Sequence, residues 1–405
     1  MKRRLLLPLI LLIASTSVFS QLEGTKWVLA PQAAALAVGP DQGDGGAWWK
    51  NSAEDVVNRA CFFDDTISFD ADGTFRNIMN GSTWIEGWQS SDPEGCNAPV
   101  APHDGSNAAT WAYDAVNKTL TVTGVGAHIG LPKVYNGGEL SEPAGADAIP
   151  SITYTVTSMT NAAMTLDIAI SGGWWRFEYV NPDYHALENS YYADPDDAAD
   201  FSVTAKTMWD ADSIYVHIDV SDDSLNTAHT NNWERDKVEL YFDMDNSKID
   251  AASGYDANDV SYGFEYGGDY SGILSGAVNA KDMKTETGWM IDIAIPWESL
   301  LAGFTPTEGM VIGYDVQAID NDGGDREHKL AMMALADQGW TNPAYIGELK
   351  FLAGGKTMPI YPAFLPWSGY TGVPMNVSYF DDPDNAADFS ATSKTLWDMD
   401  SIYVL

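Results

Sequence analysis

The chain has few cysteines and few cations, and beyond its first residues it has no long apolar run. It carries 21 Lys and Arg against 58 Asp and Glu, a net charge of −37 over 405 residues. Nucleic acid is excluded as a partner, because polyphosphate binding needs a cationic track that this chain lacks. Acidic glycans are disfavoured by the same repulsion unless a cation bridges them. Neutral sugars and divalent cations remain as partners.

The only long apolar run stands at the amino terminus. Lys2, Arg3 and Arg4 precede LLLPLILLIA, and small residues follow before Gln21. This pattern predicts a signal peptide over residues 1–20. No later stretch approaches the roughly 20 apolar residues needed to span a bilayer. We therefore expect a soluble, secreted protein, extracellular or periplasmic, with no membrane insertion.

The two cysteines, Cys61 and Cys96, are 35 positions apart. In an oxidising compartment such a pair predicts a disulfide, worth roughly 2–4 kcal/mol. Two unrelated buried thiols are the alternative that the sequence leaves open.

Residues 22–180 consist of short alternating segments separated by turn signals such as DADG and AVNKT. This pattern predicts a meander of hairpins, hence an antiparallel barrel or sandwich. We expect the last strand to supply much of the aromatic core, through Trp174, Trp175, Phe177 and Tyr179.

A long internal repeat divides the rest of the chain. Residues 190–216 match residues 378–404 at an offset of 188, so ADFSVTAKTMWDADSIYV recurs as ADFSATSKTLWDMDSIYV. Such an offset is a domain period, because solenoid repeats run about 20–50 residues. We predict one complete domain at 182–353, a linker at 354–375 and a second copy at 376–405. About 30 residues cannot bury a core, so we expect the second copy to be truncated, with further modules beyond Leu405.

Residues 22–180 resemble a lipocalin-like module of secreted polysaccharide-degrading proteins, through KWVLAPQAAALAVGP, CFFDD, PVAPHDGSNAATWAYD and WWRFEYV. The resemblance implies a β-barrel and leaves its ligand open. A barrel mouth could hold a small molecule, although filling by the barrel's own aromatic side chains is the commoner outcome.

The next domain resembles family 9 carbohydrate-binding modules, which are antiparallel β-sandwiches. The matching landmarks, in order, are TMWDADSIYVHIDVSDD, NNWERDKVELYFDMDN, TGWMIDIAIPWESL, GYDVQAIDNDGGDRE and GWTNPAYIGELKF. The opening strand before Tyr191 departs from the family pattern. The expected fold class is thus all-β, with a barrel, a sandwich and the start of a second sandwich.

Two tryptophans stand in polar loops of this domain. Trp233 precedes KVELYFD, and Trp340 lies in DQGWTNP. Exposed indoles can stack on the apolar faces of a sugar ring. The resemblance implies that Trp233 and Trp340 sandwich a terminal sugar, and that Glu239 and Gln317 hydrogen-bond to it. Alternation places Glu239 on an exposed strand face. Packed loop tryptophans and a solvated strand face are the alternatives.

Acidic clusters in the same domain supply the oxygen ligands that calcium prefers, although none is an EF-hand. A calcium ion held by a few of these carboxylates is one hypothesis, and a solvated acidic surface is the other. The candidate ligands are Asp222, Asp243, Asp245, Asp320 and Asp322.

No catalytic motif stands out. The six histidines are scattered, and we expect His217 and His328 to be satisfied or solvated. We expect Trp209 and Trp297, which lie beside apolar strands, to pack in the core. The leading hypothesis is a secreted, non-catalytic protein that binds neutral polysaccharide or oligosaccharide. The alternatives are a glycoside hydrolase with a catalytic domain beyond Leu405 or within 22–180, and an adhesin without glycan specificity.

Overall fold

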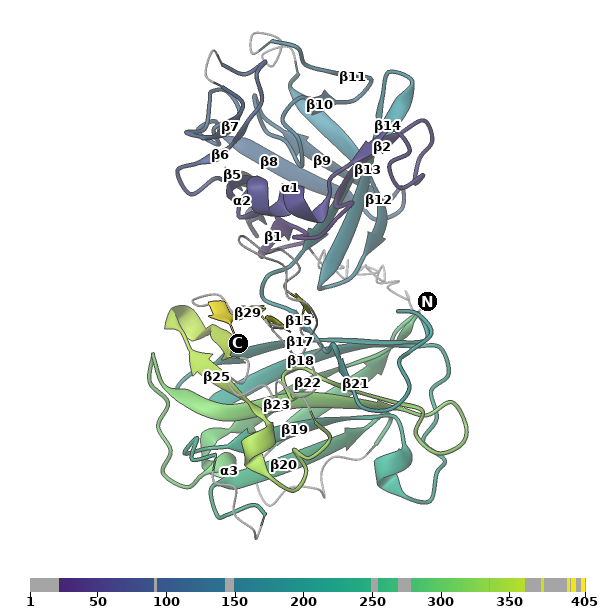
Figure 1. Ribbon diagram of the computed structural model, residues 1–405, viewed down its shortest axis with the longest axis vertical. Coiled ribbons are helices and arrows are strands. Elements are labelled where there is room, and N and C mark those ends of the chain that lie inside the picture. Colours follow the sequence, from purple (N-terminus) through teal and green to yellow (C-terminus); the bar gives the residue numbers. More distant parts are fainter. Residues whose placement is uncertain are drawn as a thin grey trace, which may run out of the picture. The chain divides into compact units, whose positions relative to one another are not determined.

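The computed structural model describes residues 22–90, 93–142, 149–248, 254–268, 278–334 and 336–360, with four short strands beyond them. The predicted signal peptide, most of the linker and most of the second copy lie outside the described residues. The chain divides into two units, Met1–Pro182 and Asp183–Leu405, each described here by itself (Figure 1). Within the described residues no helix is both long and apolar enough to cross a membrane.

The first unit is a closed antiparallel barrel, which confirms the predicted fold for this part. The ring of described strands closes where the last strand pairs with the first, Val28 opposite Val180. In ring order its eight strands are β1 (Thr25–Leu29), β4 (Thr66–Phe69), β5 (Thr74–Ile78), β8 (Ala109–Asp114), β9 (Thr119–Thr123), β12 (Ser151–Met159), β13 (Ala163–Ile170) and β14 (Gly173–Val180).

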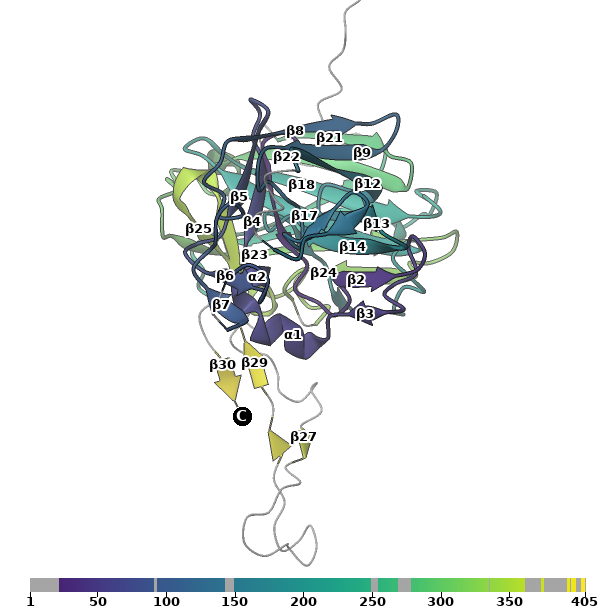
Figure 2. The same cartoon turned by 90° about the horizontal axis from the view of Figure 1, so that it is seen from above.

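Short elements decorate the barrel (Figure 2). A hairpin of β2 (Leu36–Gly39) and β3 (Trp49–Lys50) extends the sheet beyond β14. Cys61, in the second of two short helices, forms a disulfide with Cys96 in β7. The remaining elements of the unit are α1 (Ala53–Asn58), α2 (Ala60–Phe63), β6 (Thr83–Ile85), β7 (Gly95–Asn97), β10 (Val134–Tyr135) and β11 (Gly138–Glu139).

The barrel interior is filled by aromatic and aliphatic side chains. Phe177 and Tyr179 of β14 point inward, and Trp175 stacks on Phe177 at 5.9 Å. A cavity among Phe62, Ile67 and other interior residues measures only about 20 Å³. The prediction that Trp174 belongs to this core is wrong, because strict alternation along β14 turns it to the outer face.

The second unit is an antiparallel β-sandwich of two sheets, which Figure 1 shows as two layers. One sheet has the order β15 (His185–Ala186), β17 (Phe201–Trp209), β18 (Ser213–Asp222), β22 (Gly288–Pro296), β21 (Asn279–Lys284). The other has the order β16 (Asn189–Ser190), β24 (His328–Ala331), β23 (Val311–Asp320), β19 (Lys237–Asp243), β20 (Asp259–Glu265), with β25 (Gly347–Phe351) on β23 and β26 (Thr357–Ile360) on β25. The short helix α3 (Trp297–Leu300) follows β22.

The sandwich core comes from alternate residues of both sheets. Val238, Leu240 and Phe242 of β19 face Ile214, Val216 and Ile218 of β18 across the core. Trp297 is buried in this core, and Trp209 packs at its edge, where it stacks on Phe351 at 5.1 Å. Both tryptophans are therefore packing residues, as their strand context predicts.

The repeated sequence forms the same hairpin in both copies. In the first copy Thr207, Met208 and Trp209 pair with Val216, Tyr215 and Ile214. In the second, β29 (Thr395–Trp397) pairs with β30 (Ile402–Val404), with each partner shifted by the repeat offset of 188. In the same part of the chain, β28 (Thr392–Ser393) of the second copy pairs with β27 (Val373–Pro374) at the end of the predicted linker.

Candidate functional site

Trp233 and Trp340 are both exposed loop residues. Their exposed fractions are 52% and 60%. Trp340 borders a hollow of about 250 Å³ on the outer face of the sheet that contains β19. Its other lining residues are Asn232, Lys237, Glu239, Tyr241, Ser261, Tyr262, Gly263 and Glu265. Trp340 thus lines the hollow directly, whereas Trp233 follows the lining residue Asn232 in the chain and does not itself line it.

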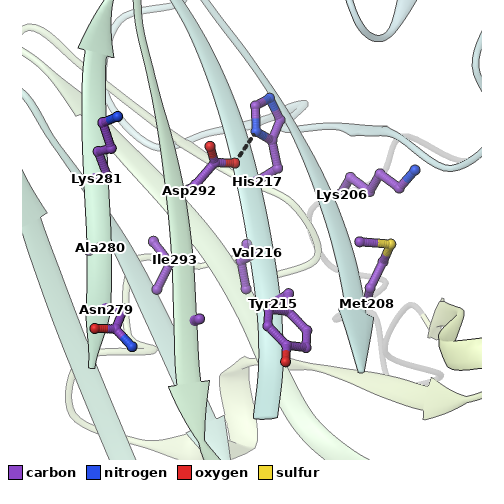
Figure 3. A pocket seen from close by; sticks show the side chains of 11 residues that line it. Lys206, Met208, Tyr215, Val216, His217, Asn279, Ala280, Lys281, Asp292 and Ile293 are labelled. Carbon is purple, nitrogen blue, oxygen red and sulfur yellow. Dashed lines mark hydrogen bonds and ion pairs between the residues drawn. The ribbon is translucent and has the colours of Figure 1, made fainter. Parts of the chain in front are cut away.

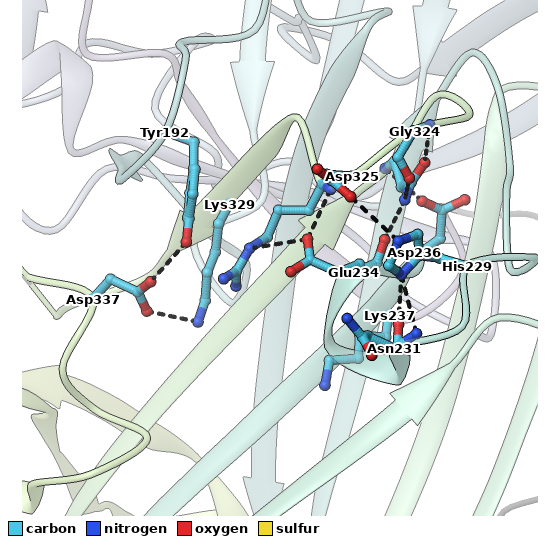
Figure 4. Close-up of polar contacts among 12 residues, drawn as sticks. Tyr192, His229, Asn231, Glu234, Asp236, Lys237, Gly324, Asp325, Lys329 and Asp337 are labelled. Carbon is cyan, nitrogen blue, oxygen red and sulfur yellow. Dashed lines mark hydrogen bonds and ion pairs between the residues drawn. The ribbon is translucent and has the colours of Figure 1, made fainter.

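The turn that carries Trp233 (Asn232–Glu234) is held by ion pairs on its C-terminal side. The Glu234 carboxylate accepts a hydrogen bond from the backbone N–H of Arg326 at 2.9 Å and lies 3.8 Å from the Arg326 guanidinium (Figure 4). The next residue, Arg235, pairs with Glu265 at 2.8 Å. These contacts hold the Trp233 backbone in place while its side chain faces solvent.

The turn that carries Trp340 is tied to the same sheet. Its indole N–H donates to the carbonyl of Asp337 at 3.2 Å, and Tyr255 donates to the carbonyl of Gly339 at 2.5 Å. The Asp337 carboxylate pairs with Lys329 of β24 at 2.8 Å (Figure 4). The backbone that carries each exposed indole is therefore already ordered. Less conformational entropy of these loops would be lost when a ligand binds.

Glu239 lies on the outward face of β19, but the prediction that this face is exposed is wrong. Its side chain is only 14% exposed and sits between two lysines, with Nζ–Oε distances of 2.6 Å to Lys237 and 3.3 Å to Lys329. Tyr241 donates a hydrogen bond to it at 2.6 Å. Burial alone would raise the pKa of Glu239, but the two lysine charges and these hydrogen bonds lower it to about 2.

Gln317 is fully buried and does not line the hollow. It sits directly opposite Glu239 in the register of β19 and β23. The loop that carries Trp340 covers it, because a Cβ added to Gly339 would lie 3.1 Å from the Gln317 amide nitrogen. The amide donates to Asp315 at 3.1 Å, and its oxygen has no hydrogen-bond partner among the described residues. Gln317 therefore supports the floor beneath the hollow.

Four polar residues of this region were not predicted from the sequence. Lys237 and Tyr241 line the hollow, and Lys329 joins Glu239, which also lines it, to Asp337. The available signal was a lysine inside each of two apolar strands, KVELYFD and HKLA. Lys329 is almost completely buried. A buried lysine needs carboxylate partners, so each such position points to a charge network.

Three predicted calcium ligands fall into two acidic clusters in one region of the sandwich. Asp222 and Asp320 join Asp236, which the sequence analysis did not include, and all three are buried. Asp322 joins Asp200 and Asp223 in the second cluster. Within each cluster one oxygen from every carboxylate lies within 4.8 Å of the others.

The buried cluster is strongly destabilised in its fully charged form. Burial, together with the charges of the neighbouring carboxylates, raises the pKa of Asp320 to about 8, that of Asp236 to about 7 and that of Asp222 to about 6. Both oxygens of Asp320 and one of Asp222 have no hydrogen-bond partner among the described residues. Such orphaned carboxylate oxygens fit a hard cation.

Asp243 and Asp245 do not belong to these clusters. Asp243 ends β19, whereas Asp236 precedes its first residue, so the length of the strand, roughly 20 Å, separates them. Asp243 instead accepts hydrogen bonds from the backbone N–H groups of Ser247 and Lys248 at 3.2 and 3.0 Å. The five predicted ligands therefore cannot share one ion.

A larger hollow, about 430 Å³, lies on the outer face of the other sheet (Figure 3). Tyr215, Met208 and Ala294 line it, and the His217 ring donates a hydrogen bond from Nδ1 to the Asp292 carboxylate at 2.7 Å. His217 also lies 3.2 Å from Asp219, so it is a satisfied histidine, as predicted. Neither Trp233 nor Trp340 lines this hollow. Its larger volume is therefore no argument that it binds the sugar.

Comparisons with known proteins identify the second unit. A family model described as "Carbohydrate family 9 binding domain-like" matches residues 178–353. These residues form a family 9 carbohydrate-binding domain. The assignment confirms the predicted resemblance, and the match includes every strand of the sandwich except β26.

Enzymes of polysaccharide breakdown contain segments similar to this family 9 domain. Exoglucanase XynX of Acetivibrio thermocellus is 32% identical over 154 residues, which cover 36% of this chain and 13% of that enzyme. Endo-1,4-beta-xylanase A of Thermoanaerobacterium saccharolyticum is 31% identical over 154 residues, 36% of this chain and 12% of that enzyme. The chain thus spans only about an eighth of the length of these curated relatives.

Solved structures similar to the chain include a family 9 module from Caldicellulosiruptor kristjanssonii. It was determined in complex with cellotriose and, separately, with glucose. The cellotriose complex is 22% identical, has a TM-score of 0.36, and the match covers 44% of this chain and 88% of that one.

Proposed function

We propose that the family 9 domain binds the ends of neutral polysaccharides or oligosaccharides between Trp233 and Trp340, as a non-catalytic part of a secreted carbohydrate-catabolic system. The observation that carries the proposal is the pair of exposed indoles on anchored turns beside one polar hollow. The enzymes that contain similar segments are named as xylanases and an exoglucanase, which favours plant-type β-glycans as ligands.

The chemistry of the hollow suits a sugar. A pyranose ring has apolar faces that desolvate against indoles, and hydroxyls that need donors and acceptors. The wall beside Trp340 supplies both, through Lys237, Glu239 and Tyr241. Glu239 is ionised at neutral pH, and a charged acceptor strengthens a hydrogen bond from a hydroxyl.

A glycoside hydrolase is the second candidate, because the curated relatives carry enzyme names and the match covers only 12–14% of their length. In that case the family 9 domain would bind the polysaccharide and keep a catalytic module close to it. Hydrolysis of xylan and cellulose by the full-length natural protein, measured as released reducing sugar, separates the two candidates.

The test of the binding site compares three tryptophan variants by titration calorimetry with cello- and xylo-oligosaccharides and by thermal melting. Trp233→Ala and Trp340→Ala should each weaken binding at least thirtyfold with little change in melting, since aromatic anchors typically contribute about 2 kcal/mol or more. Trp209→Ala should lower the free energy of unfolding by about 3 kcal/mol, because it removes ring packing and two hydrogen-bonded carbonyl contacts. Unchanged affinity in both loop variants would overturn the proposed site.

We also propose that the buried cluster of Asp222, Asp236 and Asp320 holds a structural calcium ion. Its support is the set of three close carboxylates, in which both oxygens of Asp320 and one of Asp222 have no hydrogen-bond partner among the described residues. A basic side chain lies near them, that of His328, whose ring nitrogen is 3.8 Å from Asp320. Calcium takes six to eight oxygen ligands, so backbone carbonyls or water would complete the shell.

A further inference from the structure

Two neighbouring tryptophans of the barrel unit, Trp48 and Trp49, are exposed to solvent. They belong to none of the hollows or clusters described above. Their exposed fractions are 56% and 37%. Exposed indoles at adjacent positions are unusual, because a folded chain gains free energy by burying large aromatic side chains. The family 9 match, residues 178–353, does not include these two residues.

The β2–β3 hairpin holds both rings in fixed positions. Trp49 pairs with Val38, and Val38 pairs with Trp175, so these three residues form one row across the sheet. The Trp49 ring meets the Trp175 ring edge-on at 6.0 Å. Trp48 packs against Gly173, where an added Cβ would lie 2.4 Å from the indole.

A cation braces Trp49 from the side of α1, which lies beside β3 (Figure 2). The Arg59 guanidinium lies 5.7 Å from the centre of the Trp49 ring and 4.6 Å from that of Trp84. Arg59 also lies 3.8 Å from the Asp55 carboxylate. The aromatic group is thus rigid and locally neutral.

Behind the indoles lies a polar network of carboxylates and a lysine. The Trp175 indole N–H donates to Glu139 at 3.0 Å. Lys133 lies 5.5 Å from the centre of the Trp175 ring and pairs with Glu86 at 2.9 Å and Glu139 at 3.9 Å. Glu139 keeps 40% of its side chain exposed, so it can still accept a hydrogen bond from a ligand.

The combination repeats the chemistry of the family 9 site in a different fold. There an exposed indole, Trp340, stands beside a glutamate held by lysines, Glu239. Here the exposed indole is Trp49, and the glutamate beside its partner ring is Glu139. The recurrence of one arrangement on two folds indicates one class of ligand, an inference that rests on the proposed function of the family 9 site.

We infer that Trp48, Trp49 and Glu139 form a second carbohydrate-binding site, on the barrel, for a neutral glycan. Stacking on the indoles would cover the apolar faces of a sugar ring, and Glu139 would accept from its hydroxyls. A neutral ligand follows from the charges, because Arg59 and Lys133 are already paired with carboxylates. An anionic membrane surface is disfavoured, since the chain as a whole carries a charge of −37.

Two variants, Trp48→Ala and Glu139→Gln, supplement a main set of the full chain and four variants. The four are Trp233→Ala/Trp340→Ala, which removes the family 9 site; Trp49→Ala; the triple variant combining them; and Val116→Ala, a control at a 91% exposed position in the turn between β8 and β9. Depletion onto insoluble xylan and microcrystalline cellulose measures binding, and sedimentation measures self-association. Thermal melting of each variant checks folding.

We expect the Trp233→Ala/Trp340→Ala chain to keep measurable binding to at least one polysaccharide. The triple variant should bind that polysaccharide at least tenfold more weakly. Trp48→Ala, tested in the same background, should lose binding likewise, and Glu139→Gln should lose less, because both rings remain. Val116→Ala should match its parent.

Equal binding by the double and triple variants would overturn the barrel site, and so would a chain without its family 9 site that binds neither polysaccharide. Loss of self-association in Trp49→Ala with unchanged glycan binding would also overturn it, since the indoles would then contact another copy of the chain. Conversely, binding lost only on Trp49→Ala would support the barrel site while overturning the proposed family 9 site.

Discussion

Glu239 shows how a single carboxylate can be held ionised inside a sheet. Two lysines and a tyrosine hydroxyl surround it, and its pKa falls to about 2. Because the folded pKa lies below its ordinary value, the ion pairs stabilise the fold fully above about pH 4.5. That contribution disappears as the pH falls towards 2.

Sugar affinity should therefore stay constant between pH 8 and pH 4, since Glu239 keeps its charge over that window. Titration calorimetry with cellotriose at both pH values measures this. A fall in affinity with a midpoint near pH 4.5 would contradict it, because that midpoint belongs to an ordinary glutamate.

The Glu239→Gln variant serves as its control, since it removes the titrating group. Two buried lysines then lose their carboxylate, and we expect the free energy of unfolding to fall by about 3 kcal/mol. The matched change Glu188→Gln, at an exposed residue, should move it by less than about 0.5 kcal/mol.

At the scale of elements, the loop between β24 and β25 positions the site. It covers Gln317 and carries Trp340, and Gly339 is the point of close approach between the two. A Cβ there would lie 3.1 Å from both the Gln317 amide nitrogen and a methyl group of Ile346. The loop would have to move outward by a few tenths of an ångström.

Gly339→Ala should weaken cellotriose binding about threefold to tenfold with little loss of stability, because binding groups need to be held to about 0.5 Å. Calorimetry and thermal melting of the same samples separate the two effects. Gly87→Ala, in the barrel and with nothing within 4 Å of the added Cβ, is the matched control. Wild-type affinity in Gly339→Ala would mean that the loop position does not matter.

At the scale of the whole molecule, the two units carry different stabilising devices. The barrel has the Cys61–Cys96 disulfide, and the sandwich has the buried acidic cluster. Calorimetric melting should therefore show two transitions that respond to different additives. A reducing agent should lower only the barrel transition, by the equivalent of roughly 2–4 kcal/mol.

Millimolar calcium, compared with chelator, should raise only the sandwich transition, by roughly 5–10 °C, because an ion bound by the folded state alone stabilises it by mass action. Asp320→Asn should abolish the rise. Asp245→Asn, at the other end of β19, should keep it. An equal loss in both variants, or no rise in the wild-type chain, would contradict the proposed ion site.

The sequence alone determined the fold class, the family of the sandwich and the exposed character of Trp233 and Trp340. Strand alternation and turn residues are local properties, and landmarks in a fixed order identify a family even at low identity. The prediction that the last barrel strand supplies aromatic core residues is confirmed for Trp175, Phe177 and Tyr179, and is wrong for Trp174, which alternation along β14 places on the outer face.

Only the tertiary structure decided which outward faces stay open. Alternation tells which side of β19 Glu239 occupies, but Lys237 and Lys329 enclose its carboxylate there. The loop that carries Trp340 covers Gln317, which is fully buried. The acidic residues likewise could not be grouped from spacing. Asp222 ends β18 in one sheet, Asp320 ends β23 in the other, Asp236 immediately precedes β19, and only the packing of the two sheets brings the three together. Burial and ligand geometry depend on contacts between segments far apart in the chain, and local sequence pattern carries no information about those contacts.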